Sequence, residues 1–154
     1  CDALRIPVIA AGGISDGRSM LAAMALGADG VQMGSRFVCS EESSAHINFK
    51  QRVAQAGEGE TILTLKEITP VRVIRNGFYQ QVQKAYGEHA STEQLKAVLG
   101  RARAKRGMFE GDLEEGELEI GQVSGRVNEI LPAARIVADI MNEYEELRTS
   151  LCRK

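Results

Sequence analysis

The sequence predicts an α/β fold: the C-terminal part of a (βα)8 TIM barrel, comprising its last two βα units, followed by a mostly helical C-terminal region. Two short apolar runs, each closed by glycine, flank a stretch with helical spacing, which is the pattern of a parallel strand-helix-strand unit. Two strands do not close a core, so this sheet needs neighbours. A whole barrel takes about 250 residues, whereas this chain has 154 and begins with Cys almost directly before a strand. We therefore expect the earlier barrel units to lie upstream.

Composition places the chain among globular proteins and argues against several classes. It is 44% hydrophobic and 26% charged with a net charge of −2, which excludes disorder and gives no basic stripe for a nucleic acid. Its longest apolar runs are far shorter than the roughly 20 residues of a membrane span. The three cysteines lack the spacing of a disulfide framework or a zinc site, so we expect a cytoplasmic protein without a metal.

The first barrel unit is predicted from local signals. Ile6–Ala11 is a continuous apolar run, typical of a strand buried on both faces. Ser15 or Asp16 can cap a helix over 15–27, because both have side-chain oxygens that accept from the first helical N–H groups. Gly30–Gly34 then predicts the second strand.

The middle of the chain changes character. A helix that ends at Gly57 completes the barrel part, residues 1–57, and residues 58–117 are expected to form an insertion or lid-like region of helices and loops. Leu63–Ile74 fits either a strand or an extended loop. Ser91 has capping-box spacing for a short helix, which we expect the basic cluster 101–106 to prolong.

Residues 118–154 are expected to form two helices packed on the barrel. The second begins at Pro132, a residue that suits the first helical position. The apolar positions of the first helix recur at helical spacing at Ile120, Val123, Val127 and Ile130.

Glycines at the two strand ends predict a phosphate site. Parallel strands end at one edge of the sheet, so Gly12 and Gly13 should lie beside Gly34 and Ser35, where backbone N–H groups can converge on phosphate oxygens. The start of the following helix would add its positive end. Arg36 either pairs with the phosphate or points elsewhere. The alternative is that these glycines only turn the chain.

Five segments carry a resemblance to a known family. They are Ile6–Gly17 (IPVIAAGGISDG), Leu26–Phe37 (LGADGVQMGSRF), Glu42–Lys50 (ESSAHINFK), Arg72–Asn76 (RVIRN) and Gly121–Gly125 (GQVSG). Similar versions of the first two also occur in inosine monophosphate dehydrogenase and other phosphate-binding barrels. The later three, in this order, resemble the family of nitronate monooxygenases and flavin-dependent enoyl-acyl-carrier-protein reductases, so the resemblance covers nearly the whole chain.

The resemblance implies an FMN site and an incomplete active site. The catalytic His of the family, on an earlier strand, has no counterpart here, so no catalytic residue is expected in this chain. Gly121 and Gln122 would approach the flavin or the substrate pocket. The implied FMN contacts are Ala11, Gly12, Gly13, Gln32, Met33, Gly34 and Ser35.

The resemblance also implies an activity. Lys66–Arg72 and Gly107–Asp112 are most similar to enoyl reductases, in which NAD(P)H reduces FMN and the flavin reduces a carbon–carbon double bond in fatty acid biosynthesis. A nitronate monooxygenase, which oxidises alkyl nitronates with oxygen, is the alternative within the family. A non-redox phosphate-binding barrel and a non-catalytic helical partner module are alternatives from other classes.

The expected partners are the missing N-terminal half of the barrel, a second copy of the chain in a homodimer, and an acyl carrier protein. An acyl carrier protein is acidic, so the basic cluster 101–106 could dock it. The competing interpretation is a solvated helix face.

Other conspicuous side chains have structural interpretations. We expect His46 to make a hydrogen bond in its helix rather than to act in catalysis. Arg72 and Asn76 are expected to hold each other or a backbone loop, and Cys39 is expected to be a buried, inert thiol.

Overall fold

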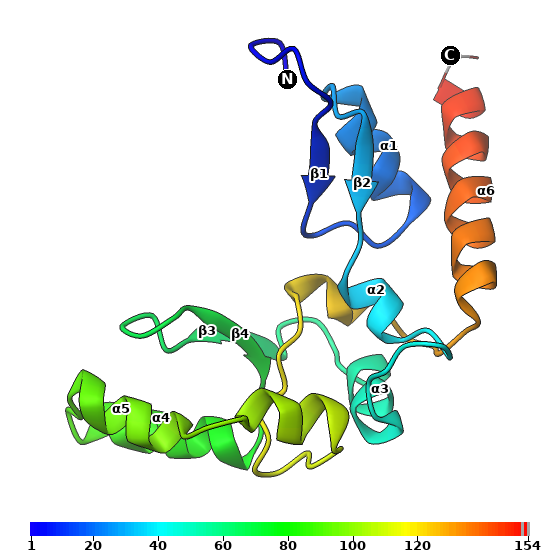
Figure 1. The fold of residues 1–154 in the computed structure, drawn as a ribbon. Helices are drawn as coiled ribbons and strands as arrows, with labels where there is room; N and C mark the ends of the chain where they lie inside the picture. Colours follow the sequence, from blue (N-terminus) through cyan, green and yellow to red (C-terminus); the bar gives the residue numbers. More distant parts are fainter. Residues whose placement is uncertain (152, 154) are drawn as a thin grey trace.

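The computed structural model describes residues 1–151 and residue 153. Figure 1 shows two arms, with the N-terminal strands, α1 and α6 in one and β3, β4, α4 and α5 in the other. The elements in chain order are β1 (Ile9–Ala11), α1 (Gly17–Ala25), β2 (Gly30–Gln32), α2 (Ser35–Val38), α3 (Ile47–Ala54), β3 (Thr61–Thr64), β4 (Val71–Ile74), α4 (Gly77–Gly87), α5 (Thr92–Leu99), the π-helical turn η1 (Lys105–Phe109), the 3-10 turn η2 (Gln122–Arg126) and α6 (Ala133–Leu151).

The predicted strand-helix-strand unit is present. Strands β1 and β2 pair in parallel from Ile9 opposite Gly30 to Ala11 opposite Gln32. Both strands are shorter than predicted, and burial on both faces is wrong for the described chain, where Ile6 and Ile9 are 70% and 55% exposed. The reason is that this parallel sheet has only two strands within the described residues, so no neighbouring strand covers their side chains.

Helix α1 begins two residues later than predicted, and its cap is Asp16 rather than Ser15. The Asp16 carboxylate accepts the backbone N–H of Ser19 at 2.8 Å, while the Ser19 hydroxyl accepts the N–H of Asp16 in return. Helix α6 packs along α1, and the two come so close at Gly17 that a Cβ there would lie 2.8 Å from the Cβ of Glu143.

The ambiguous segment Leu63–Ile74 lies in an antiparallel hairpin. Strand β3 pairs with β4 from Thr61 opposite Ile74 to Thr64 opposite Val71. Helix α4, which sequence analysis missed, follows directly, with Asn76 as its N-cap.

The basic cluster does not prolong the helix that begins after Ser91. Helix α5 has the predicted capping box but ends at Leu99, because Gly100 and Ala102 adopt positive φ angles of +64° and +60° that a right-handed helix cannot include. The cluster instead runs into η1.

The helix predicted over Ile120, Val123, Val127 and Ile130 is wrong. Only the short turn η2 is helical there, and the chain before it extends the hairpin. The N–H of Ile120 donates to the carbonyl of Arg72 at 3.0 Å, and Glu119 pairs with Val73. An extended segment with one isolated bridge to β4, followed by the turn η2, therefore carries these apolar residues. The last helix, α6, starts at Ala133, one residue after the predicted Pro132.

The main core surrounds α3 and joins it to β4 and the segment before η2. Lys50 of α3 is buried beside this core, and its ammonium donates to the carbonyls of Ser40, Glu41 and Ser43 at 2.7, 3.1 and 2.9 Å. No helix in the described part of the chain combines the length and apolar character needed to cross a membrane. The buried residues of the main core are Cys39, Phe49, Val53, Ala56, Ile74, Leu118, Ile120 and Val127.

Candidate functional site

A cavity of about 350 Å³ lies at the carboxyl ends of β1 and β2, and we call it the glycine cradle. Its walls come from the loops that follow the two strands and from the segment that enters η2, more than 80 residues later. The lining residues are Ala11, Gly12, Gly13, Ile14, Gln32, Gly34, Ser35, Gly121 and Val123.

The glycines expose the backbone of the cradle. Gly12 and Gly13 have φ angles of +90° and +71°, which L side chains rarely adopt, and a Cβ at Gly12, Gly13 or Gly34 would meet no atom within 4 Å. Among the turn, loop and side-chain hydrogen bonds of the described residues, none uses the N–H of Gly13, Gly34 or Ser35. The backbone at both strand ends can thus donate to an anion without losing a partner.

Ser35 and Gly121 close the cradle on the side of η2. The N–H of Gly121 donates to the Ser35 hydroxyl oxygen at 3.1 Å. A Cβ at Gly121 would lie 2.7 Å from that oxygen, so the contact requires glycine. This contact seats η2 beside the strand ends.

Seven of the nine residues predicted for the cofactor or the adjoining pocket meet in this one cavity. Gln122 lines an adjoining pocket instead, and Met33, although it lies between Gln32 and Gly34, is not among the lining residues of the cradle. Ile14 and Val123 line the cradle but were not predicted as site residues. Their apolar side chains carried no local signal of a ligand site.

The start of α1 does not offer its N–H groups as predicted. Glu143 of α6 accepts the N–H of Gly17 at 2.8 Å, and Asp16 accepts that of Ser19. Partial burial opposes ionisation of Asp16, but hydrogen bonds from Ser19 and the charges of Arg126 and Arg18 outweigh it and lower the pKa of Asp16. Two carboxylates thus already occupy this helix end.

Of the two alternatives predicted for Arg36, the structure shows the second, in which its side chain points elsewhere. Its guanidinium donates to the backbone carbonyl of Glu129 at 3.2 Å and lies 3.9 Å from the Glu129 carboxylate. The arginine beside the Gly12–Gly13 loop is Arg126, which sequence analysis missed and which pairs with Asp16 at 2.6 Å.

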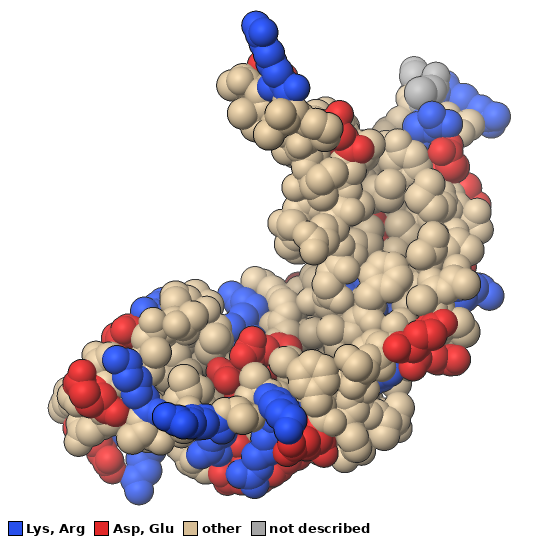
Figure 2. Space-filling model, in the orientation of Figure 1, with Lys and Arg blue, Asp and Glu red and all other residues tan. Residues whose placement is uncertain are grey.

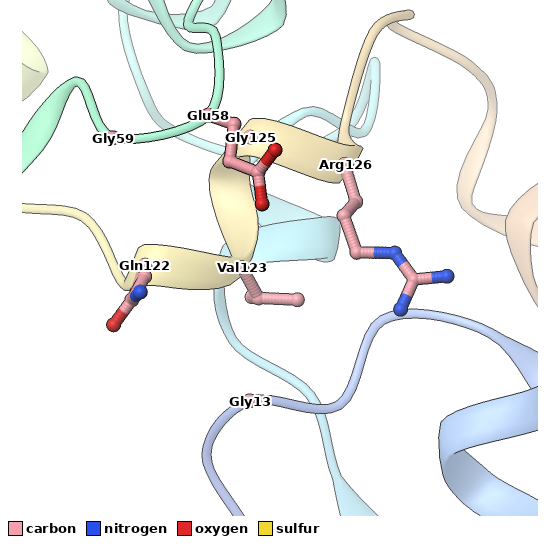
Figure 3. Close-up of a pocket in the computed structure, with 7 residues that line it drawn as sticks. All are labelled: Gly13, Glu58, Gly59, Gln122, Val123, Gly125 and Arg126. Atoms are coloured by element: carbon pink, nitrogen blue, oxygen red, sulfur yellow. The ribbon is translucent and has the colours of Figure 1, made fainter.

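A second pocket, of about 600 Å³, adjoins the cradle and shares Gly13 and Val123 with it. We call it the Arg126 pocket. Figure 3 shows that Glu58 lies in the loop before β3, Gln122 at the start of η2 and Arg126 at its end, with the Gln122 side chain pointing away from the side on which Arg126 lies. The pocket therefore carries a cation, an anion and an amide beside the cradle.

Comparison with known proteins identifies the family. The profile of the nitronate monooxygenase family matches residues 1–143. The chain belongs to the nitronate monooxygenase family. A protein of Staphylococcus saprophyticus named "probable nitronate monooxygenase" is 34% identical over 148 residues, which are 95% of this chain and 41% of that protein.

Solved structures extend this family to FabK. The structure of FabK from Thermotoga maritima is 41% identical with a TM-score of 0.89, over 97% of this chain and 48% of FabK. A nitroalkane oxidase from Streptomyces ansochromogenes is 34% identical with a TM-score of 0.73, over 97% of this chain and 42% of that chain. These neighbours are TIM barrels, so this member of the family is a partial barrel that spans less than half of their length.

Other predicted residues of this family member have structural roles. His46 caps α3, where its Nδ1 accepts the N–H of Asn48 at 3.1 Å. Arg72 donates to the carbonyl of Thr61, and the Asn76 amide to backbone carbonyls in the 113–116 loop. Cys39 is fully buried, which raises the pKa of its thiol. The predicted hydrogen bond of His46, the predicted backbone contacts of Arg72 and Asn76, and the predicted burial of Cys39 are therefore confirmed.

The basic cluster is largely paired within the chain. Arg103 lies 3.0 Å from Glu115, Lys105 lies 3.2 Å from Glu110, and the Arg106 guanidinium lies 2.7 Å from Asp112. Figure 2 shows acidic and basic side chains mixed over this arm, while the N-terminal strands and α1 present mostly uncharged surface.

Proposed function

We propose that this chain forms the flavin-binding C-terminal part of an FMN-dependent enoyl-acyl-carrier-protein reductase, with β1 and β2 as the last two strands of the barrel. The observation that carries the proposal is the glycine cradle, one cavity that glycine-rich backbone from two parallel strand ends lines together. In this proposal residues 1–57 complete the barrel, residues 58–117 form an insertion beside the site, and residues 118–154 pack on the barrel.

The residues of the cradle fit the phosphate end of a flavin. Gly12, Gly13 and Gly34 leave the backbone open, and their N–H groups would hold the phosphate oxygens, with the Ser35 hydroxyl as an additional donor. Gln32 lines the same cavity and would orient the cofactor through its amide. When bound, FMN supplies hydride transfer between NAD(P)H and an activated double bond, while this chain binds and orients it.

Two activities compete within the family. FabK of Thermotoga maritima shares 41% identity with this chain, and the nitroalkane oxidase and the Staphylococcus saprophyticus relative share 34% each. The greater identity to FabK, together with the Lys66–Arg72 and Gly107–Asp112 segments, favours the enoyl reductase. Nitronate oxidation with oxygen is the second candidate, because the printed names of two of these relatives refer to nitronate or nitroalkane oxidation.

The test is an anaerobic titration of the purified full-length protein with NADH and NADPH, followed by the visible absorbance of oxidised flavin. Rapid bleaching, reversed by crotonyl-coenzyme A, is the result expected for an enoyl reductase. A yellow protein that bleaches only with an alkyl nitronate would support the monooxygenase. A colourless protein that releases no flavin on denaturation would contradict both and favour a non-redox phosphate-binding barrel.

Carrier docking and a homodimer are further parts of the proposal. The ion pairs of Arg103, Lys105 and Arg106 leave less net positive charge for an acidic carrier than the sequence alone suggests. Reversing the charge of Arg101, which is exposed, tests docking: an unchanged KM for a carrier-linked substrate would remove it. Sedimentation of the full-length protein tests the dimer.

A further inference from the structure

The Arg126 pocket has the size and the chemistry of a second ligand site. Its volume of about 600 Å³ exceeds that of the glycine cradle and falls within the usual range for small-molecule sites. Because the two cavities share Gly13 and Val123, a molecule in one would lie directly beside a molecule in the other. A ligand in the pocket would therefore lie beside the part of the flavin that the cradle holds.

Arg126 is held in place and is still accessible. One N–H group of its guanidinium reaches the Asp16 carboxylate at 2.6 Å, while 59% of the side chain is exposed. Asp16 is itself fixed by Ser19, and the hydrogen bonds from Ser19 together with the charges of Arg126 and Arg18 lower its pKa against the opposing effect of burial. An arginine has several further N–H donors, and Figure 3 shows this side chain lying over the loop that contains Gly13.

The other polar groups of the pocket complement a phosphate ester that also carries hydroxyl or amide groups. Arginine binds phosphate oxygens through its planar set of donors. The carboxylate of Glu58 accepts hydrogen bonds and repels a second anion, and the amide of Gln122 can donate and accept. Dinucleotide sites use each of these groups: a carboxylate binds the ribose hydroxyl of NAD, and an arginine binds the 2′-phosphate of NADP.

We infer that the Arg126 pocket binds the phosphate ester of a second ligand, separate from the flavin, with Arg126 on the phosphate and Glu58 on a neighbouring hydroxyl or amide. This inference rests on the proposed function, because the cradle is then filled by FMN. Two molecules of the proposed reaction have this chemistry: the nicotinamide nucleotide that supplies hydride, and the phosphopantetheine arm of the acyl thioester.

The experiment compares three variants of the full-length, flavin-loaded protein. Arg126→Gln removes the guanidinium, and Asp16→Asn removes the partner that holds it. Arg135→Gln is the matched control, since Arg135 is similarly exposed and pairs with Asp139 at 2.7 Å on α6. Calorimetry measures the Kd of NADP⁺, NAD⁺ and coenzyme A, and the flavin released on denaturation gives the cofactor content.

The expected result is a rise of about tenfold or more in Kd for either the nicotinamide nucleotides or coenzyme A in Arg126→Gln, at unchanged flavin content. Asp16→Asn should raise the Kd of the same probe by less than half the factor expected for Arg126→Gln. Arg135→Gln should leave the Kd unchanged. The class of probe whose affinity falls identifies the source of the phosphate. These binding measurements decide the inference even if NAD(P)H fails to bleach the flavin, a failure that would count against the proposed activity alone.

Three results would overturn the inference. Loss of flavin from Arg126→Gln would assign the charge to the flavin phosphate. Equal losses of affinity in Asp16→Asn and Arg126→Gln would show that Arg126 only fixes the loop between β1 and α1. An unchanged Kd for all three probes would leave the pocket without a phosphate ligand.

Discussion

The two arms of the molecule differ in how far their backbone N–H and C=O groups are hydrogen-bonded within the chain. In the β1–α1–β2 unit the strands are three residues long and Ile9 is exposed, and among the described residues no turn, loop or side-chain hydrogen bond uses the N–H of Gly13 or Gly34. In the arm of β3, β4, α4 and α5, strand pairing and caps use the backbone groups, and Phe78 is fully buried. The first arm therefore leaves apolar side chains and backbone donors open, whereas the second arm is closed by its own pairing and packing.

This difference predicts two separable kinds of damage. Substitutions in the closed arm should lower the free energy of unfolding and spare the affinity for flavin. Substitutions in the glycine loops should lower the affinity for flavin and spare the free energy of unfolding. Those residues bury little apolar surface and are expected to contact the cofactor.

The largest effect on stability is expected from Phe78→Ala. Phe78 packs with Leu65 and Val82, and Arg103 lies 5.0 Å above its ring. Emptying this site should cost about 3–5 kcal/mol of unfolding free energy in chemical denaturation. Phe109→Ala, at a side chain that is 48% exposed, is the control and should cost far less. Equal losses would contradict the view that this arm holds a closed core.

The largest effect on the ligand is expected from Gly34→Val. The φ of Gly34 is −97°, which valine accepts, and its Cβ would enter open space, so stability should change by less than about 1 kcal/mol. The side chain would fill the cradle, and we expect flavin affinity to fall about 100-fold in reconstitution of the apoprotein. Gly57→Val, also at an open position, should retain flavin. A yellow Gly34→Val protein with full flavin content would contradict the assignment of the glycine cradle as the flavin site.

A smaller effect, on pH dependence, is expected at Glu117. Burial, helped by the nearby negative charge of Glu119 and opposed by Arg103, raises the pKa of Glu117 from 4.5 to about 7. The folded state thus binds this proton more tightly than the unfolded state, so the stability it contributes is complete below about pH 4.5 and is lost as pH rises through about 7.

Glu117→Gln should remove that dependence and stabilise the protein by about 1–3 kcal/mol at pH 8, measured by denaturation across pH 4 to 8. Glu93→Gln on the exposed surface of α5 is the control and should leave the profile unchanged. A wild-type profile that is flat between pH 4.5 and 7 would contradict the assignment.

The smallest effect is expected from Ser91→Ala. Ser91 and Gln94 form the capping box of α5, so the substitution should cost about 1 kcal/mol in thermal or chemical unfolding. Flavin affinity should not change, because α5 lies in the closed arm. Thr92→Ala, at the neighbouring position, should cost less.

The loops and helix caps that depend on local signals were predicted correctly from the sequence. Four features could be predicted from residues only a few positions apart in the sequence. They are the Gly12–Gly13 loop, the Gly34–Ser35 loop, the cap at Asp16 and the capping box at Ser91. Local signals predicted Gly12, Gly13, Gly34 and Ser35 of the cradle, whereas Ala11, Gln32 and Gly121 were predicted from the family resemblance.

The errors fall where distant contacts decide the structure. The spacing of Ile120, Val123 and Val127 fits a helix, but Ile120 pairs with Arg72 and Val127 enters the main core. The role of Arg126 depends on Asp16, more than 100 residues away, so no nearby residue pointed to it. Helix α4 was missed because only Arg75 separates its cap, Asn76, from the end of β4, so no loop marks the start of the helix.

The hydrogen bond from Gly121 to Ser35 has a consequence for the order of folding. It joins residues that are 86 positions apart, and closing so long a segment costs entropy that the contact alone cannot offset. Residues 40–120 must first form their own core and bring η2 to the strand ends, since contacts between distant residues form slowly. The last wall of the cradle is therefore completed late, and capture of flavin during refolding should report the final step of assembly rather than the first.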